Sequence, residues 1–146
     1  MTQELAASLD RDGRGDESLV RDALQESVEA ALLVAVVQRR TLPGPEDLQV
    51  EPEPYLLGLG DVVGEIRRLA LDRLGHGDVA MADAYVDLMD TLYRALLRFD
   101  TTRAIVALKP KQDAARALVE RTRGEVTMAR VLMNATDGSS GRQERH

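Results

Sequence analysis

Apolar residues recur at helical spacing along most of the chain, and no stretch shows the apolar and polar alternation of a half-buried strand. The pattern predicts helices over about residues 17–40, 54–74, 79–99 and 101–123, with a last short helix near 125–132. Asp16 suits the N-cap of the first helix, Pro54 the first turn of the second, and Gly124 the C-cap of the fourth. The predicted fold class is therefore all-α.

Breaks in this pattern set the expected domain limits. Residues 1–15 contain the polar run DRDGRG and predict a disordered N-terminal segment. Residues 41–54 hold several prolines and predict an irregular connection. Pro110 is expected to kink or divide the fourth helix, because its ring removes a backbone hydrogen bond. We expect a helical domain over 16–134 and a disordered C-terminal tail over 135–146.

Composition narrows the chemistry. The chain has one Phe, three Tyr and no Trp, so its core must consist mainly of aliphatic side chains. It has no cysteine, which excludes disulfides, zinc–thiolate sites and thiol catalysis. The longest apolar run is far shorter than the roughly 20 residues of a membrane span, and the N-terminus is polar and acidic. A cytoplasmic location is expected.

The net charge of −6 argues against simple electrostatic binding of nucleic acid. However, Lys109 and Lys111 are the only lysines, and acidic, lysine-poor chains resemble those of halophilic, high-salt cytoplasms. At such ionic strength the screening length falls to about 3 Å, so long-range steering contributes little. Net charge therefore does not decide the partner.

Two pairs of carboxylates stand out. Glu26 and Glu29 share one face of the first helix, and Asp61 and Glu65 share one face of the second. Both pairs are expected roughly opposite the main apolar stripe, which is also where a merely solvated surface would place them. If the two faces meet, the clustered hard oxygens would suit Mg²⁺ or Mn²⁺.

Glycines accompany the second pair. Gly58, Gly60 and Gly64 lie within a helical pattern, although each costs roughly 1 kcal/mol relative to alanine. They remove side-chain bulk, so a packed neighbour or a phosphate backbone can approach closely. Which of these two partners approaches is left open.

Other candidates give weaker indications. Asp83, Asp87 and Asp90 share a face of the third helix, but an Asp90–Arg94 pair favours a solvated stripe. Neither His76 nor the terminal His146 has a second imidazole nearby in the sequence. No P-loop, dinucleotide fingerprint or nucleophile motif is present.

The segments LQESVEAALL, YLLGLGDVVGEIRRLALDRLGHGD and ERTRGE resemble, in this order, the translin family and in particular its translin-associated factor X (Trax) branch. The resemblance covers roughly residues 18–130. It implies an antiparallel bundle of the translin type, without the family's first helix. It also implies a homo-oligomer that binds single-stranded RNA or DNA. The Trax branch is a metal-dependent endoribonuclease.

Through this resemblance Glu26, Glu29 and Asp61 fall on the acidic positions of the Trax active site, and Glu65 on an adjacent acid. They are the implied catalytic residues and ligands of Mg²⁺ or Mn²⁺, with Glu26 or Glu29 as the base for the attacking water. Arginines on exposed helix faces of an acidic protein mostly balance charge, and this is the alternative to contact with RNA for each arginine here. The candidates for contact with RNA are Arg39, Arg40, Arg67, Arg68, Arg121 and Arg123.

The leading hypothesis is thus an endoribonuclease that hydrolyses phosphodiester bonds of single-stranded RNA. One alternative is a non-catalytic single-stranded RNA- or DNA-binding protein of the translin type. Another is a helical assembly subunit whose acids form only a halophilic surface.

Overall fold

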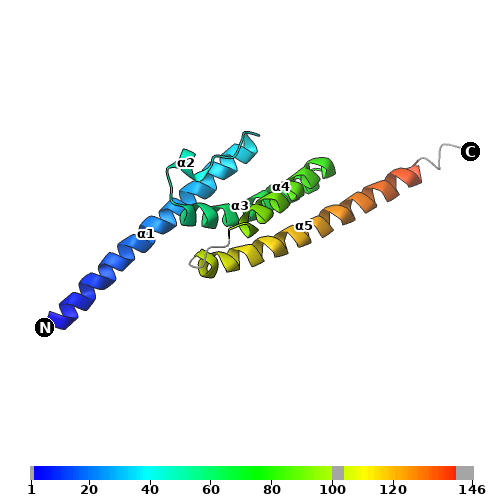
Figure 1. Cartoon of the computed structure of the whole chain (residues 1–146). Helices are drawn as coiled ribbons and strands as arrows, with labels where there is room; N and C mark the ends of the chain where they lie inside the picture. The colour runs from blue at the N-terminus through cyan, green and yellow to red at the C-terminus, as the bar shows by residue number, and fades with distance from the viewer. Residues whose placement is uncertain (1, 100–103, 141–146) are drawn as a thin grey trace, which may run out of the picture. The chain divides into compact units, whose positions relative to one another are not determined.

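The computed structural model describes the backbone of residues 2–99 and 104–140, with side chains over 17–99 and 107–136. All regular structure in these ranges is helical, which confirms the all-α prediction (Figure 1). The elements are α1 (Thr2–Val37), α2 (Pro45–Leu48), α3 (Pro52–Gly75), α4 (Val79–Leu97) and α5 (Ala104–Ser140).

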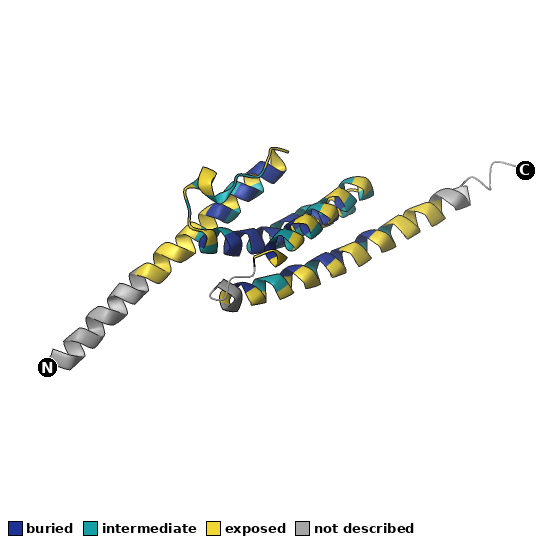
Figure 2. Ribbon diagram, viewed as in Figure 1, coloured by how far each residue is buried: buried dark blue, intermediate teal, exposed yellow. Residues whose placement is uncertain are grey.

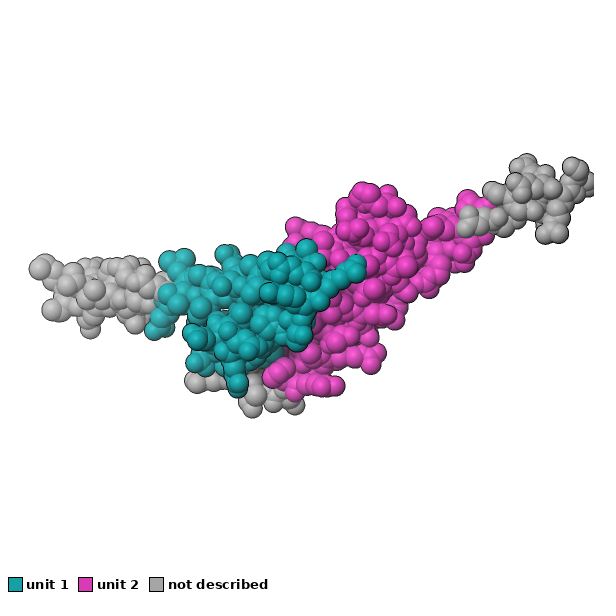
Figure 3. Space-filling model, turned by 90° about the horizontal axis from the view of Figure 1, so that it is seen from above, with its two compact units in different colours: residues 1–59 teal, residues 60–146 magenta. Residues whose placement is uncertain are grey.

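The chain divides into two compact units, residues 1–59 and 60–146, coloured separately in Figure 3. The boundary falls inside α3, so this helix contributes its first turns to one unit and the rest to the other. The expectation of a single helical domain over 16–134 stays a prediction.

The first unit is built on α1 and the start of α3. Helix α1 buries one stripe, and the start of α3 buries its leucines (Figure 2). Tyr55 ties the connecting segment to this unit, because its hydroxyl donates a hydrogen bond to the Pro43 carbonyl at 3.0 Å. Burial, together with the nearby Asp47, raises the pKa of Tyr55. The buried apolar residues of this unit are Val28, Leu32, Ala35, Val36, Leu56, Leu57 and Leu59.

Gly58 permits the close approach of α3 to α1 within this unit. A Cβ atom at position 58 would lie 2.8 Å from the Gln25 carbonyl oxygen and 2.8 Å from Val28 Cγ1. Both distances are shorter than van der Waals contact, and one involves backbone that cannot rotate away. Gly58 is therefore present for a packed helix neighbour, which answers for this position the question that the sequence left open.

The second unit packs α4 against α5 (Figure 1). Asp78 caps the start of α4, accepting a hydrogen bond from the Met81 amide at 3.0 Å. At its other end, Gln112 Nε2 donates to the Leu96 carbonyl at 2.9 Å. The helical spacing of the sequence predicts the inward side of α4 as Ala82, Tyr85, Val86, Met89, Leu92, Tyr93 and Leu96. All of these are fully or nearly fully buried except the two tyrosines, which are partly buried. The buried apolar side chains on α5 are Leu108, Ala115, Val119 and Val126.

The helix limits differ from the predictions at several points. Helix α1 begins at Thr2 rather than near Asp16, so the backbone of residues 2–15 is helical instead of irregular. The residues Leu5, Ala6 and Ala7, which precede the polar run DRDGRG, have high helix propensity and favour this helix. The proline-rich connection contains the short helix α2, with Pro45 at its first turn.

Helix α5 is also longer than predicted. It runs through Pro110 and Gly124 and reaches Ser140, so Gly124 is not a C-cap. Pro110 lies inside α5, six residues after Ala104, so it does not divide the helix as one of the two expected outcomes had it. The predicted tail over 135–146 is helical as far as 140, and its residues 141–146 lie outside the described part, as do 100–103 at the expected start of this helix.

Candidate functional site

Glu26 and Glu29 lie on successive turns of α1, in the first unit. Val28, between them in the sequence, is 1% exposed and packs against Gly58, and this fixes the directions in which the two carboxylates face. Glu26 is exposed, whereas Glu29 is partly buried. One carboxylate of this pair therefore faces water while the other stands at the edge of the packed face.

Asp61 and Glu65 lie on successive turns of α3, in the second unit. Their side chains are only 27% and 28% exposed, respectively. Val62 and Ile66, which follow them in the sequence, are completely buried. This pair therefore does not lie on a fully solvated face of α3, and its carboxylates need neighbouring cations or hydrogen-bond donors.

Lys111 is the partner of Asp61, and sequence reasoning did not identify it. Its ammonium group, on α5, donates a hydrogen bond to Asp61 Oδ1. The only sequence signal was that Lys111 is one of two lysines in a chain whose other cations are arginines. A contact between residues so far apart in the sequence could not be read from that signal.

Glu65 has a different neighbour. Arg68 lies three residues further along α3, with its Nη1 atom 3.3 Å from Glu65 Oε1. The Arg68 side chain is 79% exposed, so this is a surface pair of the kind that contributes about 0–1 kcal/mol. The Arg68 guanidinium is therefore held only weakly by Glu65 and is accessible to solvent.

Arg67 is held inside the second unit. Its Nη1 donates to Glu125 Oε2 at 2.6 Å and its Nη2 to Glu125 Oε1 at 3.1 Å, a bidentate pair between α3 and α5. Nη1 also donates to Thr122 Oγ1 at 2.7 Å, and Thr122 is completely buried. The hydrogen bonds from Arg67 lower the pKa of Glu125, and those to Glu125 raise the pKa of Arg67. Arg67 thus has a structural role, whatever its part in contact with RNA.

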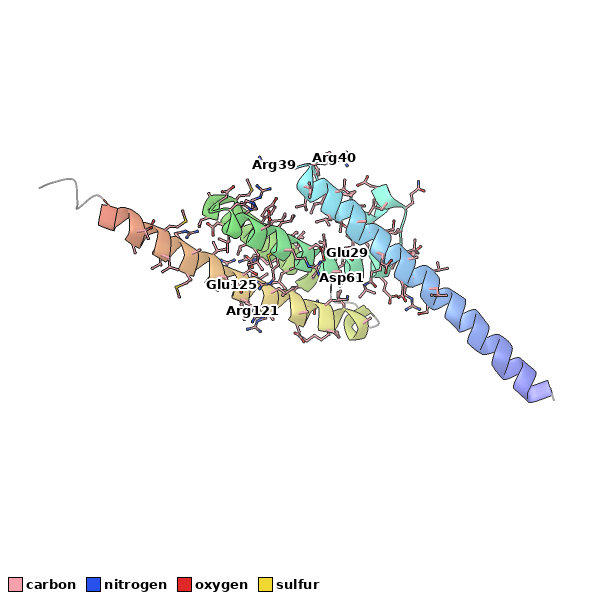
Figure 4. The ribbon with its side chains drawn as sticks, turned by 180° about the vertical axis from the view of Figure 1, so that it is seen from behind. Glu29, Arg39, Arg40, Asp61, Arg121 and Glu125 are labelled. Atoms are coloured by element: carbon pink, nitrogen blue, oxygen red, sulfur yellow. The ribbon has the colours of Figure 1, made fainter. Side chains whose placement is uncertain are left out.

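The remaining arginine candidates are exposed. Figure 4 labels Arg39 and Arg40 at the end of α1 and Arg121 on α5. Arg121 is 74% exposed and lies 3.8 Å from Glu125. Arg123 is 52% exposed, and its Nη2 atom lies 3.9 Å from Asp90 Oδ2. Contact of these residues with RNA stays a prediction.

A shallow groove of about 220 Å³ between α4 and α5 brings Arg123 close to further cations. Within it Arg94 Nε donates to Asp90 Oδ2 at 2.9 Å, which confirms the predicted Asp90–Arg94 pair. Asp83, on the same helix, pairs with Arg130 at 2.7 Å. The groove is lined by Asp90, Tyr93, Arg94, Arg116, Val119, Glu120 and Arg123.

The two carboxylate pairs occupy different units, Glu29 being labelled on α1 and Asp61 on α3 in Figure 4. Among the described residues no three acidic or histidine side chains gather closely enough to hold a metal ion. The donor chemistry, which is carboxylate only, fits Mg²⁺ or Mn²⁺ rather than zinc. The cluster of all these acids around a metal ion stays a prediction.

Comparison with known proteins places the chain in a family. The family model described as Translin family matches residues 17–124. An uncharacterised protein of Methanocaldococcus jannaschii is 35% identical over 103 residues, which are 70% of this chain and 46% of that protein. These findings establish an all-helical protein that belongs to the translin family.

Solved structures agree with this assignment. The crystal structure of AfC3PO matches with a TM-score of 0.70 and 36% identity, covering 79% of this chain and 61% of that one. The structure of AfC3PO in complex with duplex RNA gives a TM-score of 0.70 at 35% identity, with the same coverage. Apo-NeC3PO gives 0.67 at 27% identity, covering 75% of this chain and 57% of that one. The chain thus spans about half to three fifths of the length of these relatives.

Within the described part of the chain, no helix is both long and apolar enough to cross a bilayer.

Proposed function

We propose that this chain binds RNA and hydrolyses its phosphodiester bonds in single-stranded regions, with Mg²⁺ or Mn²⁺ as cofactor. The observation that carries the proposal is the state of the Asp61–Glu65 pair. These carboxylates are partly buried on consecutive turns of α3, beside the exposed guanidinium of Arg68. Carboxylates one helical turn apart repel one another, and a divalent cation held by both would offset that repulsion.

Membership of the translin family supports the nucleic-acid part of the proposal. AfC3PO, to which the chain is 35% identical in that comparison, has a solved structure in complex with duplex RNA. The catalytic part rests on the acids that the resemblance to the Trax branch singles out, Glu26, Glu29, Asp61 and Glu65.

The proposed chemistry assigns each group a part. When bound, a divalent cation supplies Lewis acidity toward the phosphate and toward the attacking water. Asp61 and Glu65 would hold it through carboxylate oxygens. Glu26 or Glu29 would accept the proton of the water, for which the exposed Glu26 is open to solvent. Arg68 would bind a non-bridging phosphate oxygen.

Cleavage of an end-labelled single-stranded RNA tests the proposal. We expect cleavage with Mg²⁺ or Mn²⁺, none with chelator, and at least about a hundredfold loss in Glu26→Ala and Asp61→Asn. Asp87→Asn is the matched control, since Asp87 is an exposed acid on α4, and it should cleave like the native chain. Cleavage that survives chelation, or full activity in both site variants, would refute the mechanism.

The competing function is RNA or DNA binding without cleavage. It predicts binding that persists in chelator and does not depend on Glu26. Arg68→Ala should weaken it, while Arg73→Ala, an exposed arginine near the end of the same helix, should not. A binding titration with a labelled single strand, run beside the cleavage assay, separates the two functions.

A further inference from the structure

The contact between Lys111 and Asp61 joins α5 to the acidic pair on α3. The Lys111 ammonium donates to Asp61 Oδ1, and the two side chains are 31% and 27% exposed. Both residues belong to the second unit, so the contact lies within one compact body. Asp61 is therefore not a bare carboxylate waiting for a cation, because a cation from the chain already lies against it.

Gly60 makes room for this lysine. A Cβ atom at position 60 would lie 3.0 Å from Lys111 Cβ, which is tighter than ordinary contact, and 3.4 Å from its Cγ. The aliphatic stem of Lys111 thus passes over the bare backbone of Gly60, and its ammonium reaches the next residue, Asp61. Alanine at position 60 would require the stem of Lys111 to give way by a few tenths of an ångström.

The other lysine shows that this arrangement is specific. Lys109 precedes Lys111 by two residues, is 62% exposed, and pairs at 2.7 Å with Asp113 on its own helix. Lysine at position 111 is also unusual for this chain, because apart from the two lysines every basic side chain is arginine or histidine. An ammonium on a flexible stem can move away from a carboxylate, whereas a bidentate guanidinium such as that of Arg67 is fixed in place.

We infer that Lys111 is the counter-ion of Asp61 in the metal-free chain, and that a divalent cation binds Asp61 only by displacing the Lys111 ammonium. The inference rests on the proposed function, since it concerns a ligand of the proposed metal site. A divalent cation on either oxygen of Asp61 would lie close to the Lys111 ammonium, and like charges at so short a distance repel strongly. Lys111 would then keep Asp61 oriented and neutralised until metal arrives, and would set how tightly metal binds.

Mn²⁺ binding to the full chain, followed by electron paramagnetic resonance of the free ion, tests this directly. Lys111→Met removes the competing charge and keeps most of the stem. We expect it to bind Mn²⁺ about tenfold more tightly than the native chain, as for the loss of one close charge contact. Lys109→Met is the matched control and should bind within about twofold of the native chain.

A purely structural role for Lys111 predicts the opposite result. If the lysine only supports Asp61, its removal should weaken Mn²⁺ binding or leave it unchanged, and either outcome overturns the inference. Lys111→Gln repeats the test with a polar head group in case the Met variant does not fold. The double variant Asp61→Asn/Lys111→Met should not bind Mn²⁺ more tightly than the native chain, because the tighter binding of Lys111→Met acts through Asp61.

Thermal unfolding gives a second readout that needs no RNA. In chelator, Lys111→Met should unfold at a lower temperature than the native chain, and added Mn²⁺ should raise its midpoint by more. Absence of Mn²⁺ binding in every variant would overturn both this inference and the metal-dependent part of the proposed function. If instead the native chain binds Mn²⁺ through Asp61 and cleaves RNA, while Lys111→Met binds no more tightly, only the inference falls.

Discussion

Gly58 on α3 lies so close to Val28 on α1 that a Cβ atom at position 58 would come within 2.8 Å of Val28 Cγ1. Gly58→Ala should therefore lower the free energy of unfolding by about 1–3 kcal/mol through overpacking. Urea denaturation followed by circular dichroism measures the change. Gly64→Ala is the control on the same helix, because its Cβ would meet only Leu118 Cδ1, at 3.9 Å. It should gain about 0.5–1 kcal/mol from higher helix propensity. Equal effects of the two substitutions would contradict the close approach of α1 and α3.

Gly124 distinguishes the observed helix from the predicted one. Helix α5 passes through it, and a Cβ atom there would have no neighbour within 4 Å. Gly124→Ala should thus stabilise the chain by about 1 kcal/mol, measured by urea denaturation. Destabilisation would instead indicate the left-handed C-cap that the sequence predicts at this position.

Arg67 and Arg68 are adjacent, yet they should respond differently to the same substitution. Arg67→Lys keeps the charge but loses the bidentate geometry toward Glu125, and should cost about 1–3 kcal/mol of unfolding free energy. Arg68→Lys, at an exposed pair, should change it by no more than about 0.5 kcal/mol. Thermal and urea unfolding of both variants provide the comparison, and equal losses would contradict the assigned structural role of Arg67.

The stabilisation from Glu125 should depend on pH. Because hydrogen bonds from Arg67 lower the pKa of Glu125 in the folded chain, the charged carboxylate stabilises the fold at pH values above the unfolded pKa of about 4.3. This contribution is lost as pH falls through the lowered folded pKa. The native chain should exceed Glu125→Gln in stability at pH 7, and the difference should shrink as the pH drops below about 4. Glu120→Gln, at an exposed pair with Arg116, should give only a small difference throughout. A Glu125 difference that does not change with pH would contradict the ion pair.

The C-terminal part of α5 presents an apolar stripe. Met128, Val131 and Leu132 are 62%, 58% and 60% exposed and follow one another at helical spacing. Exposed apolar stripes of this kind mark contact surfaces, which agrees with the predicted homo-oligomer. Leu132→Glu should reduce the molar mass measured by light scattering, while Thr127→Glu, also exposed on α5, should not. An unchanged molar mass in Leu132→Glu would show that this stripe takes no part in oligomer assembly.

The bodies of the helices could be predicted because the apolar period is local information. The inward side of α4, from Ala82 to Leu96, agrees with the burial that the structure shows. Helix ends were predicted less well. Gly124 and Pro110 carry strong local preferences that the tertiary packing of α5 overrides, since Leu108, Ala115 and Val126 are buried along the same helix.

The sequence by itself determined the fold class, the excluded chemistries and the resemblance that selects Glu26, Glu29, Asp61 and Glu65. These follow from residue types and from spacing along the chain. Only the tertiary structure showed what two glycines of α3 make room for: Gly58 for the backbone of α1, and Gly60 for the stem of Lys111. It also decided that Arg67 binds Glu125 and that Asp61 has a lysine partner. Such contacts join residues some fifty positions apart, and no local pattern records which side chains meet when helices pack.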